Sequence, residues 1–221
     1  MSAAIRTLQS RLAALGFDPL GIDGIPGYNT AKALVAAWRA GAVPRFDPIV
    51  DAALAEVAAA TPNQRDLPAL TGLAPDLYAD DPSRPGGCVW TERGRGWESR
   101  NLIPVLVPGY SKPLRLHRRA AFAIVVGFGE CVVFEGMPEA RMESFCLRHM
   151  NWDSAQPLTT HGYGVSVDRD WDCDGKMERI EGNLARYAPC LARVGLVMGD
   201  HWKDRPKKKV RDAMHVQAAR V

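Results

Sequence analysis

A proline-rich stretch constrains the fold most, because it separates two parts of the chain with different hydrophobic patterns. Five prolines and the pair Gly86-Gly87 fall between residues 61 and 87. Before this stretch, apolar residues recur at helical spacing, and from residue 102 onward they form short runs typical of mixed strands and helices. We therefore expect a small domain over residues 1–62, a linker over 63–98 that packs partly on the second domain, and an α+β domain over 99–221.

The first 62 residues carry the pattern of three helices. Gly16 follows the first apolar stripe as a C-cap, and Phe17 is expected to fold back on the helix end. Asn29 or Thr30 is expected to cap the second helix, and residues 49–57 form the third apolar pattern. The first stripe consists of Ile5, Leu8, Leu12 and Leu15. The fold class predicted for this region is all-α.

Composition excludes several classes of protein. With 28 basic and 25 acidic residues in 221, the formal charge of +3 is too small to require a nucleic-acid partner. The five cysteines form no Cys-x-x-Cys pair, so neither a cysteine zinc site of the usual spacing nor a disulfide framework is expected. No apolar run approaches the roughly 20 residues that span a bilayer, so we expect no integral membrane association. The expected state is a monomer.

Two residues in the segment 157–168 are plausible zinc ligands. His161 offers a nitrogen and Asp168 an oxygen, and a short strand is expected to end at Asp168. A fully extended chain would hold these residues roughly 23 Å apart, too far to share one ion. Gly162 and Gly164 allow the backbone to fold back. The spacing therefore suits a metal site only if a loop precedes the strand.

A second group of such residues lies near the end of the chain. His215 could supply a third ligand, and Asp212 could reach the same side of a tight turn. Two histidines and one carboxylate leave the fourth tetrahedral position to water, as in catalytic zinc sites. A carboxylate that does not bind the metal can accept a proton from that water. Asp212 is the candidate for this role.

The residues that follow Asp168 match the pattern of a calcium-binding loop, Asp-x-Asp-x-Asp-Gly-x5-Glu. A strand is expected before this loop in place of the usual entering helix, whereas helical spacing follows from residue 178 to 193. The alternative is a solvated acidic turn that binds no ion. The candidate calcium ligands are Asp170, Asp172, Asp174, the carbonyl of Lys176, and Glu181.

Two stretches of the chain resemble known families. The order Leu8-Gln9, Leu15-Gly16-Phe17, Ile22-Asp23-Gly24, Gly27 and Thr30 resembles the peptidoglycan-binding domain of cell-wall hydrolases. His-x6-Asp followed by Asp-x-x-His is similar to the zinc D-alanyl-D-alanine carboxypeptidases of the VanY type and to phage L-alanyl-D-glutamate endolysins. The sequence Pro157 to Gly164 and the element Gly199-Asp200-His201-Trp202 extend this likeness. One departure is Val216-Gln217, where that family often has an aromatic residue and then Glu.

The second resemblance implies particular roles. His161, Asp168 and His215 would bind Zn²⁺, and Asp212 would act as the general base. An arginine upstream of the first histidine would hold the substrate and stabilise the oxyanion. Arg148 is the first choice for that arginine, and Arg141 is the alternative.

Together the resemblances predict a two-domain peptidoglycan hydrolase, a phage endolysin that cleaves stem peptides with zinc-activated water. The first choice is an L-alanyl-D-glutamate endopeptidase, and the close alternative is a D-Ala-D-Ala carboxypeptidase. A non-catalytic wall-binding or virion structural protein is the alternative of another class. Since the N-terminus has no signal-peptide pattern, synthesis in the host cytoplasm and action at the cell wall or periplasm after release are expected.

Overall fold

The structure is a computed structural model that describes residues 1–171, 173–175, 177, 184–199 and 212–220. In the described residues it is a mixed α+β fold with seven α-helices and three small antiparallel sheets. The α-helices are α1 (Ala3–Ala14), α2 (Tyr28–Arg39), α3 (Pro48–Ala59), α4 (Leu67–Thr71), α5 (Glu92–Asn101), α6 (Ala121–Glu135) and α7 (Leu184–Arg193).

The strands of the three sheets are short. They are β1 (Tyr78–Asp80), β2 (Cys88–Trp90), β3 (Leu102–Val105), β4 (Leu114–His117), β5 (Met142–Glu143), β6 (Ser166–Arg169), β7 (Val197–Gly199) and β8 (Asp212–Gln217). β1 pairs with β2, and β3 pairs with β4. The remaining four strands form one sheet in the order β5-β6-β8-β7. Four 3-10 turns complete the described elements, η1 (Gln64–Asp66), η2 (Pro75–Leu77), η3 (Met150–Trp152) and η4 (Thr160–Tyr163).

The N-terminal region is helical, as predicted, and its first helix ends as its sequence indicates. Gly16 adopts a φ of +84°, and the Phe17 amide donates back to the Leu12 carbonyl at 2.9 Å. The prediction for the start of α2 was wrong. Its N-cap is Gly27, without a side-chain hydrogen bond, and the Thr30 hydroxyl instead accepts a buried hydrogen bond from the Gln9 amide.

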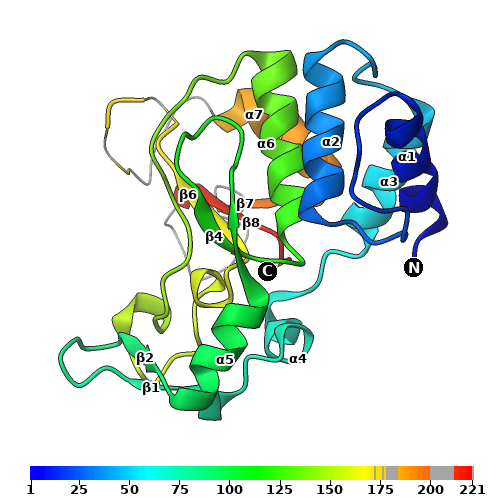
Figure 1. Ribbon diagram of the computed structural model, residues 1–221. Helices are drawn as coiled ribbons and strands as arrows, with labels where there is room; N and C mark the ends of the chain where they lie inside the picture. Colours follow the sequence, from blue (N-terminus) through cyan, green and yellow to red (C-terminus); the bar gives the residue numbers. More distant parts are fainter. Residues whose placement is uncertain (172, 176, 178–183, 200–211, 221) are drawn as a thin grey trace.

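The N-terminal helices share their core with the rest of the chain. α2 lies along α6, and α7 packs on α6 as well (Figure 1). A buried Glu130 on α6 reinforces this contact: its Oε1 lies 2.9 Å from Nε of Arg45 and 2.6 Å from Nη1 of Arg193. Because Arg45 precedes α3 and Arg193 ends α7, the ion pairs join three segments. The helices of residues 1–62 therefore pack directly on the predicted second domain.

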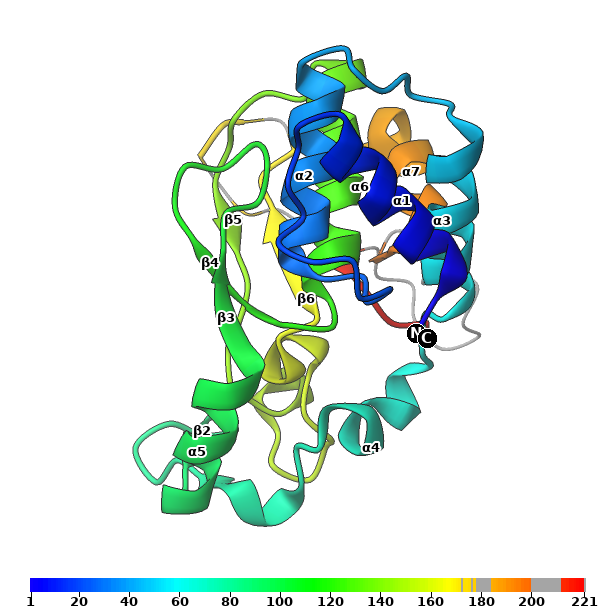
Figure 2. The same cartoon turned by 45° about the vertical axis from the view of Figure 1, so that its right-hand side comes forward.

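Residues 63–98, predicted as a linker, form structured elements at one end of the molecule. They contain α4, the β1–β2 hairpin and the start of α5, and Figure 2 shows these elements below the four-stranded sheet and the long helices. Trp97 of α5 is buried, and its indole N–H donates to the Thr71 carbonyl at 2.8 Å. The Trp97 ring also packs against Trp90 of β2, with ring centroids 5.6 Å apart, so this end of the molecule has apolar contacts of its own.

Candidate metal centre

Three predicted ligands come from neighbouring elements. Asp168 on β6 stands directly opposite His215 on β8 in the antiparallel register. Side chains of such cross-strand pairs lie on the same face of a sheet, so this pairing brings the two residues together. His161 belongs to η4, and Gly164 after it adopts a φ of +68°. The predicted fold-back before the strand is thus confirmed, although β6 runs one residue beyond Asp168.

The ligand atoms of these three residues converge. Nε2 of His161 lies 3.1 Å from Oδ1 of Asp168 and 3.1 Å from Nδ1 of His215. Nδ1 of His215 lies 2.9 Å from the same Asp168 oxygen. Both histidines are buried, and the Asp168 side chain is 16% exposed. The group could therefore hold a metal ion.

Hydrogen bonds on the outer side of each imidazole determine which nitrogen faces this centre. Nδ1 of His161 donates to the Ser144 carbonyl at 2.6 Å. Nε2 of His215 lies 3.0 Å from Oε1 of Gln217 and 3.2 Å from the Thr160 hydroxyl. Gln217 is itself oriented, because its amide nitrogen donates to the Ala219 carbonyl at 2.7 Å. A neutral ring bonded in this way directs a lone pair inward, as metal-binding histidines do.

The charge on Asp168 also suits a cation. Burial by itself would raise the pKa of this carboxyl, but the contacts of its oxygen with the His161 and His215 rings outweigh burial and hold the pKa well below its usual value. The carboxylate is therefore ionised at neutral pH. Two imidazole lone pairs and one carboxylate oxygen about 3 Å apart repel one another, and a cation between them removes that repulsion. The donor set fits a metal ion.

The predicted general base, Asp212, lies at the start of β8 and not in the tight turn that we expected. The pairing of β7 with β8 is irregular. Met198 stands opposite Val216, but the next residue, Gly199, stands opposite Asp212, so the register shifts between these two pairs. Oδ1 of Asp212 is buried and accepts no hydrogen bond from any residue in the described part of the chain. Among the described residues, the ligand atoms that converge are those of His161, Asp168 and His215, and Asp212 is not part of that group.

The two candidate arginines have different surroundings. The Arg148 guanidinium lies 5.0 Å from the centre of the Trp152 ring. The backbone carbonyl of Arg148 accepts a hydrogen bond from the backbone N–H of Thr159, which lies two residues before His161. Arg141 is exposed and pairs with Glu143. Arg148 therefore comes from a segment bonded to the turn of His161, whereas Arg141 is engaged at the surface.

The candidate calcium loop is described only in part. Asp172, Lys176 and Glu181 lie outside the described residues. Asp170 is buried, and its carboxylate accepts the backbone N–H groups of Cys173 and Gly175, each at 2.8 Å. Asp170 thus closes a turn of its own backbone. Calcium binding by this loop stays a prediction.

The residues on the outer side of the histidines were missed by sequence reasoning. Ser144 acts through a backbone carbonyl, which carries no sequence signal. Gln217 did carry a sequence signal, because it stands where the family that the chain resembles often has Glu. Both Gln and Glu side chains can accept a hydrogen bond from a histidine N–H. That substitution was treated only as a departure from the family pattern.

The described residues contain no helix that is both long enough and apolar enough to cross a membrane. Comparison of the chain with protein-family models, with curated proteins and with solved structures found no match.

Proposed function

We propose that the chain is a zinc peptidase that hydrolyses the stem peptides of peptidoglycan, with the bond between L-Ala and D-Glu as its first target. The observation that carries the proposal is the buried His161, Asp168 and His215 group, whose imidazoles turn their lone pairs inward. Two histidines and one carboxylate are the ligand set of many catalytic zinc sites, in which water completes the tetrahedron.

When bound, zinc supplies Lewis acidity, which polarises the scissile carbonyl and lowers the pKa of a water molecule toward neutrality. The chain's own residues would do the rest. His161, Asp168 and His215 would hold the ion, while Ser144 and Gln217 keep the two rings in the required tautomers.

Asp212 would accept the proton from the attacking water and pass it to the leaving amine. Its unpartnered Oδ1 supports this role, because no hydrogen bond from a described residue must break first. Arg148 would place positive charge where the tetrahedral oxyanion develops. Its support is the backbone bond that joins its segment to the turn of His161.

The helices α1, α2 and α3 would bind the wall polymer, as the resemblance of their sequence implies. Because α2 packs along α6, this region would hold the catalytic centre in one orientation relative to bound peptidoglycan. The enzyme would act at the cell wall after release from the cytoplasm, as an endolysin does.

The test is digestion of purified murein by the wild-type chain and by Asp212→Ala. Mass spectrometry of the new termini separates the alternatives: a free amino group on D-Glu supports the endopeptidase, and released D-Ala supports the carboxypeptidase. We expect Asp212→Ala to lower the rate about 10²- to 10⁴-fold, the usual contribution of a general base, while zinc content is unchanged.

The matched control is Glu92→Ala, which removes an exposed carboxylate at the start of α5, outside both the metal-ligating group and residues 1–62. It should digest murein at the wild-type rate. Hydrolysis by Asp212→Ala at the wild-type rate would refute the role of Asp212. If the zinc-loaded wild-type chain released neither product, the remaining candidate would be a non-catalytic wall-binding protein.

A further inference from the structure

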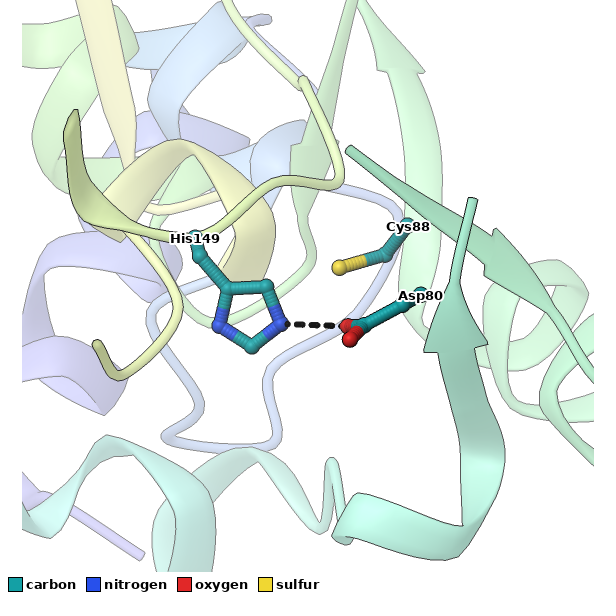
Figure 3. Close-up of side chains that lie close together, drawn as sticks. All are labelled: Asp80, Cys88 and His149. Atoms are coloured by element: carbon teal, nitrogen blue, oxygen red, sulfur yellow. Dashed lines mark hydrogen bonds and ion pairs between the residues drawn. The ribbon is translucent and has the colours of Figure 1, made fainter. Parts of the chain in front are cut away.

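A second group of metal-ligating side chains lies at the β1–β2 hairpin. Asp80 ends β1, Cys88 begins β2, and His149 precedes η3. Their ligand atoms all lie within 4.8 Å of one another, and Nε2 of His149 is 3.1 Å from Oδ1 of Asp80. Figure 3 shows the Cys88 sulfur and the Asp80 carboxylate both directed toward the imidazole. None of these three residues was singled out from the sequence.

The backbone holds the three residues in place without help from a ligand. Asp80 and Cys88 are direct partners in the hairpin register. The Cys88 amide donates to the Leu147 carbonyl at 3.1 Å, and the His149 amide donates to the Gly86 carbonyl at 2.9 Å. Gly86 has a φ of +69°, and a Cβ there would lie 1.9 Å from the backbone of Trp152. The hairpin and the segment 147–152 therefore meet backbone to backbone.

The outer nitrogen of His149 is engaged in the same way as the outer nitrogen of His161. Its Nδ1 faces the Gln156 carbonyl in a short contact and must donate to it, because a carbonyl only accepts. In the neutral ring Nε2 then carries a lone pair, which faces the Asp80 carboxylate. Nε2 is therefore the nitrogen that can bind an ion shared with Asp80 and Cys88.

From this geometry we infer that Asp80, Cys88 and His149 form a second zinc site. Zinc accepts sulfur, nitrogen and carboxylate oxygen in one tetrahedron, whereas calcium and magnesium prefer oxygen alone. The Asp80 side chain is 63% exposed, whereas that of His149 is 9% exposed, so the site opens to solvent on the side of Asp80. Water can therefore occupy the fourth position.

An ion at this site would fasten the β1–β2 hairpin to the segment 144–149. The same segment carries the Ser144 carbonyl that orients His161, and the Cys146 amide donates to the His161 carbonyl at 3.4 Å. The second site would thus stabilise a segment that contacts the buried centre. The inference is independent of the proposed peptidase activity, since it rests on a different set of ligands.

Cobalt substitution of the full chain tests the inference directly. A thiolate bound to Co²⁺ gives a charge-transfer absorption in the near ultraviolet, and the buried group has no sulfur with which to produce one. We expect the band in the wild-type chain and in His215→Ala. We expect its loss in Cys88→Ser, together with the loss of one zinc ion per chain in equilibrium dialysis and a fall in zinc affinity at this site of more than about 100-fold.

Two further variants keep the test decisive. Asp80→Asn changes an exposed side chain and should weaken cobalt binding at this site while the circular dichroism of the chain is unchanged. Cys173→Ser changes an exposed cysteine in another part of the chain and should keep the band. Absence of the band in the wild-type chain, its persistence in Cys88→Ser, or a disulfide between Cys88 and another cysteine would overturn the inference.

The outcomes also separate the two metal sites. One bound ion that is lost in His215→Ala but kept in Cys88→Ser would refute this inference and leave the proposed peptidase intact. One bound ion that is lost in Cys88→Ser but kept in His215→Ala would support this inference and refute the zinc centre of the proposed peptidase.

Discussion

The two groups share a histidine and a carboxylate but differ in the environment of that carboxylate. In each, the outer Nδ1 of one histidine donates to a main-chain carbonyl, Ser144 for His161 and Gln156 for His149. Asp168 is largely enclosed between two imidazoles, whereas Asp80 is mostly hydrated. The same pair of ligand types can thus support two kinds of site. An enclosed carboxylate attracts a cation strongly by itself, whereas a hydrated one needs a further strong ligand, here the Cys88 thiolate.

The largest expected difference concerns hydrolysis. Asp168→Asn removes the charged ligand of the buried group, so we expect murein hydrolysis to fall to background. Asp80→Asn leaves that group intact, and the rate should stay within about threefold of wild type, in line with a role outside the chemistry. Rates on purified murein at equal protein concentration and equal added zinc check both variants. Comparable losses in the two variants would show that the groups are not functionally distinct.

The second expected difference is the pH dependence of Cys88 in the metal-free chain. Burial raises the pKa of its thiol to about 11, and the charge of Asp80 adds to this effect. A raised pKa favours the thiol, so at pH 8 the thiolate fraction is roughly two hundredfold lower than for an ordinary cysteine. Alkylation of Cys88 should therefore increase about tenfold per pH unit until near pH 11.

Mass spectrometry of the Cys88 peptide measures this rate site by site. Asp80→Asn removes the nearby negative charge and should speed alkylation at a given pH. Zinc should protect Cys88 at each pH at which the ion is bound. A rate that levels off near pH 8.5, as for an unperturbed thiol, would contradict the partly buried environment of Cys88.

A third comparison uses two glutamines that hold histidines in different ways. Gln217 contacts His215 through its side-chain amide, whereas Gln156 contacts His149 through its backbone carbonyl. Gln217→Ala should therefore weaken metal binding at the buried group about 10- to 100-fold, as for other residues that orient metal-binding histidines. Gln156→Ala keeps its carbonyl and should leave the affinity of the hairpin site unchanged. Competition with a chromogenic chelator measures both affinities.

The smallest expected effect is that of Thr160→Val. This change removes the second oxygen near Nε2 of His215, but Gln217 still accepts the N–H. Metal affinity at the buried group should fall less than about tenfold, below the effect of Gln217→Ala. If the two effects were reversed, Thr160 and not Gln217 would be the main partner of His215.

Features set by neighbouring residues could be predicted from the sequence. The end of α1 at Gly16 and the fold-back before β6 depend on local backbone preferences, and both are found. The helix α6 was harder to predict from the sequence. Gly127-Phe128-Gly129 separates two short apolar runs, a pattern that suggests two elements and not one helix. The packing of α2 and α7 on α6 provides a tertiary environment that overrides the low helix propensity of glycine.

What the sequence by itself determined is the helical N-terminal region, the mixed character of the remainder, and three candidate ligands named by their likeness to a family. Only the tertiary structure decided that Asp168 and His215 face each other across two strands and that Asp80, Cys88 and His149 meet at all. Helix caps and turns depend on energies within a few residues. Contacts between residues 61 positions apart, such as Cys88 and His149, depend on backbone pairing and burial, which no local spacing encodes.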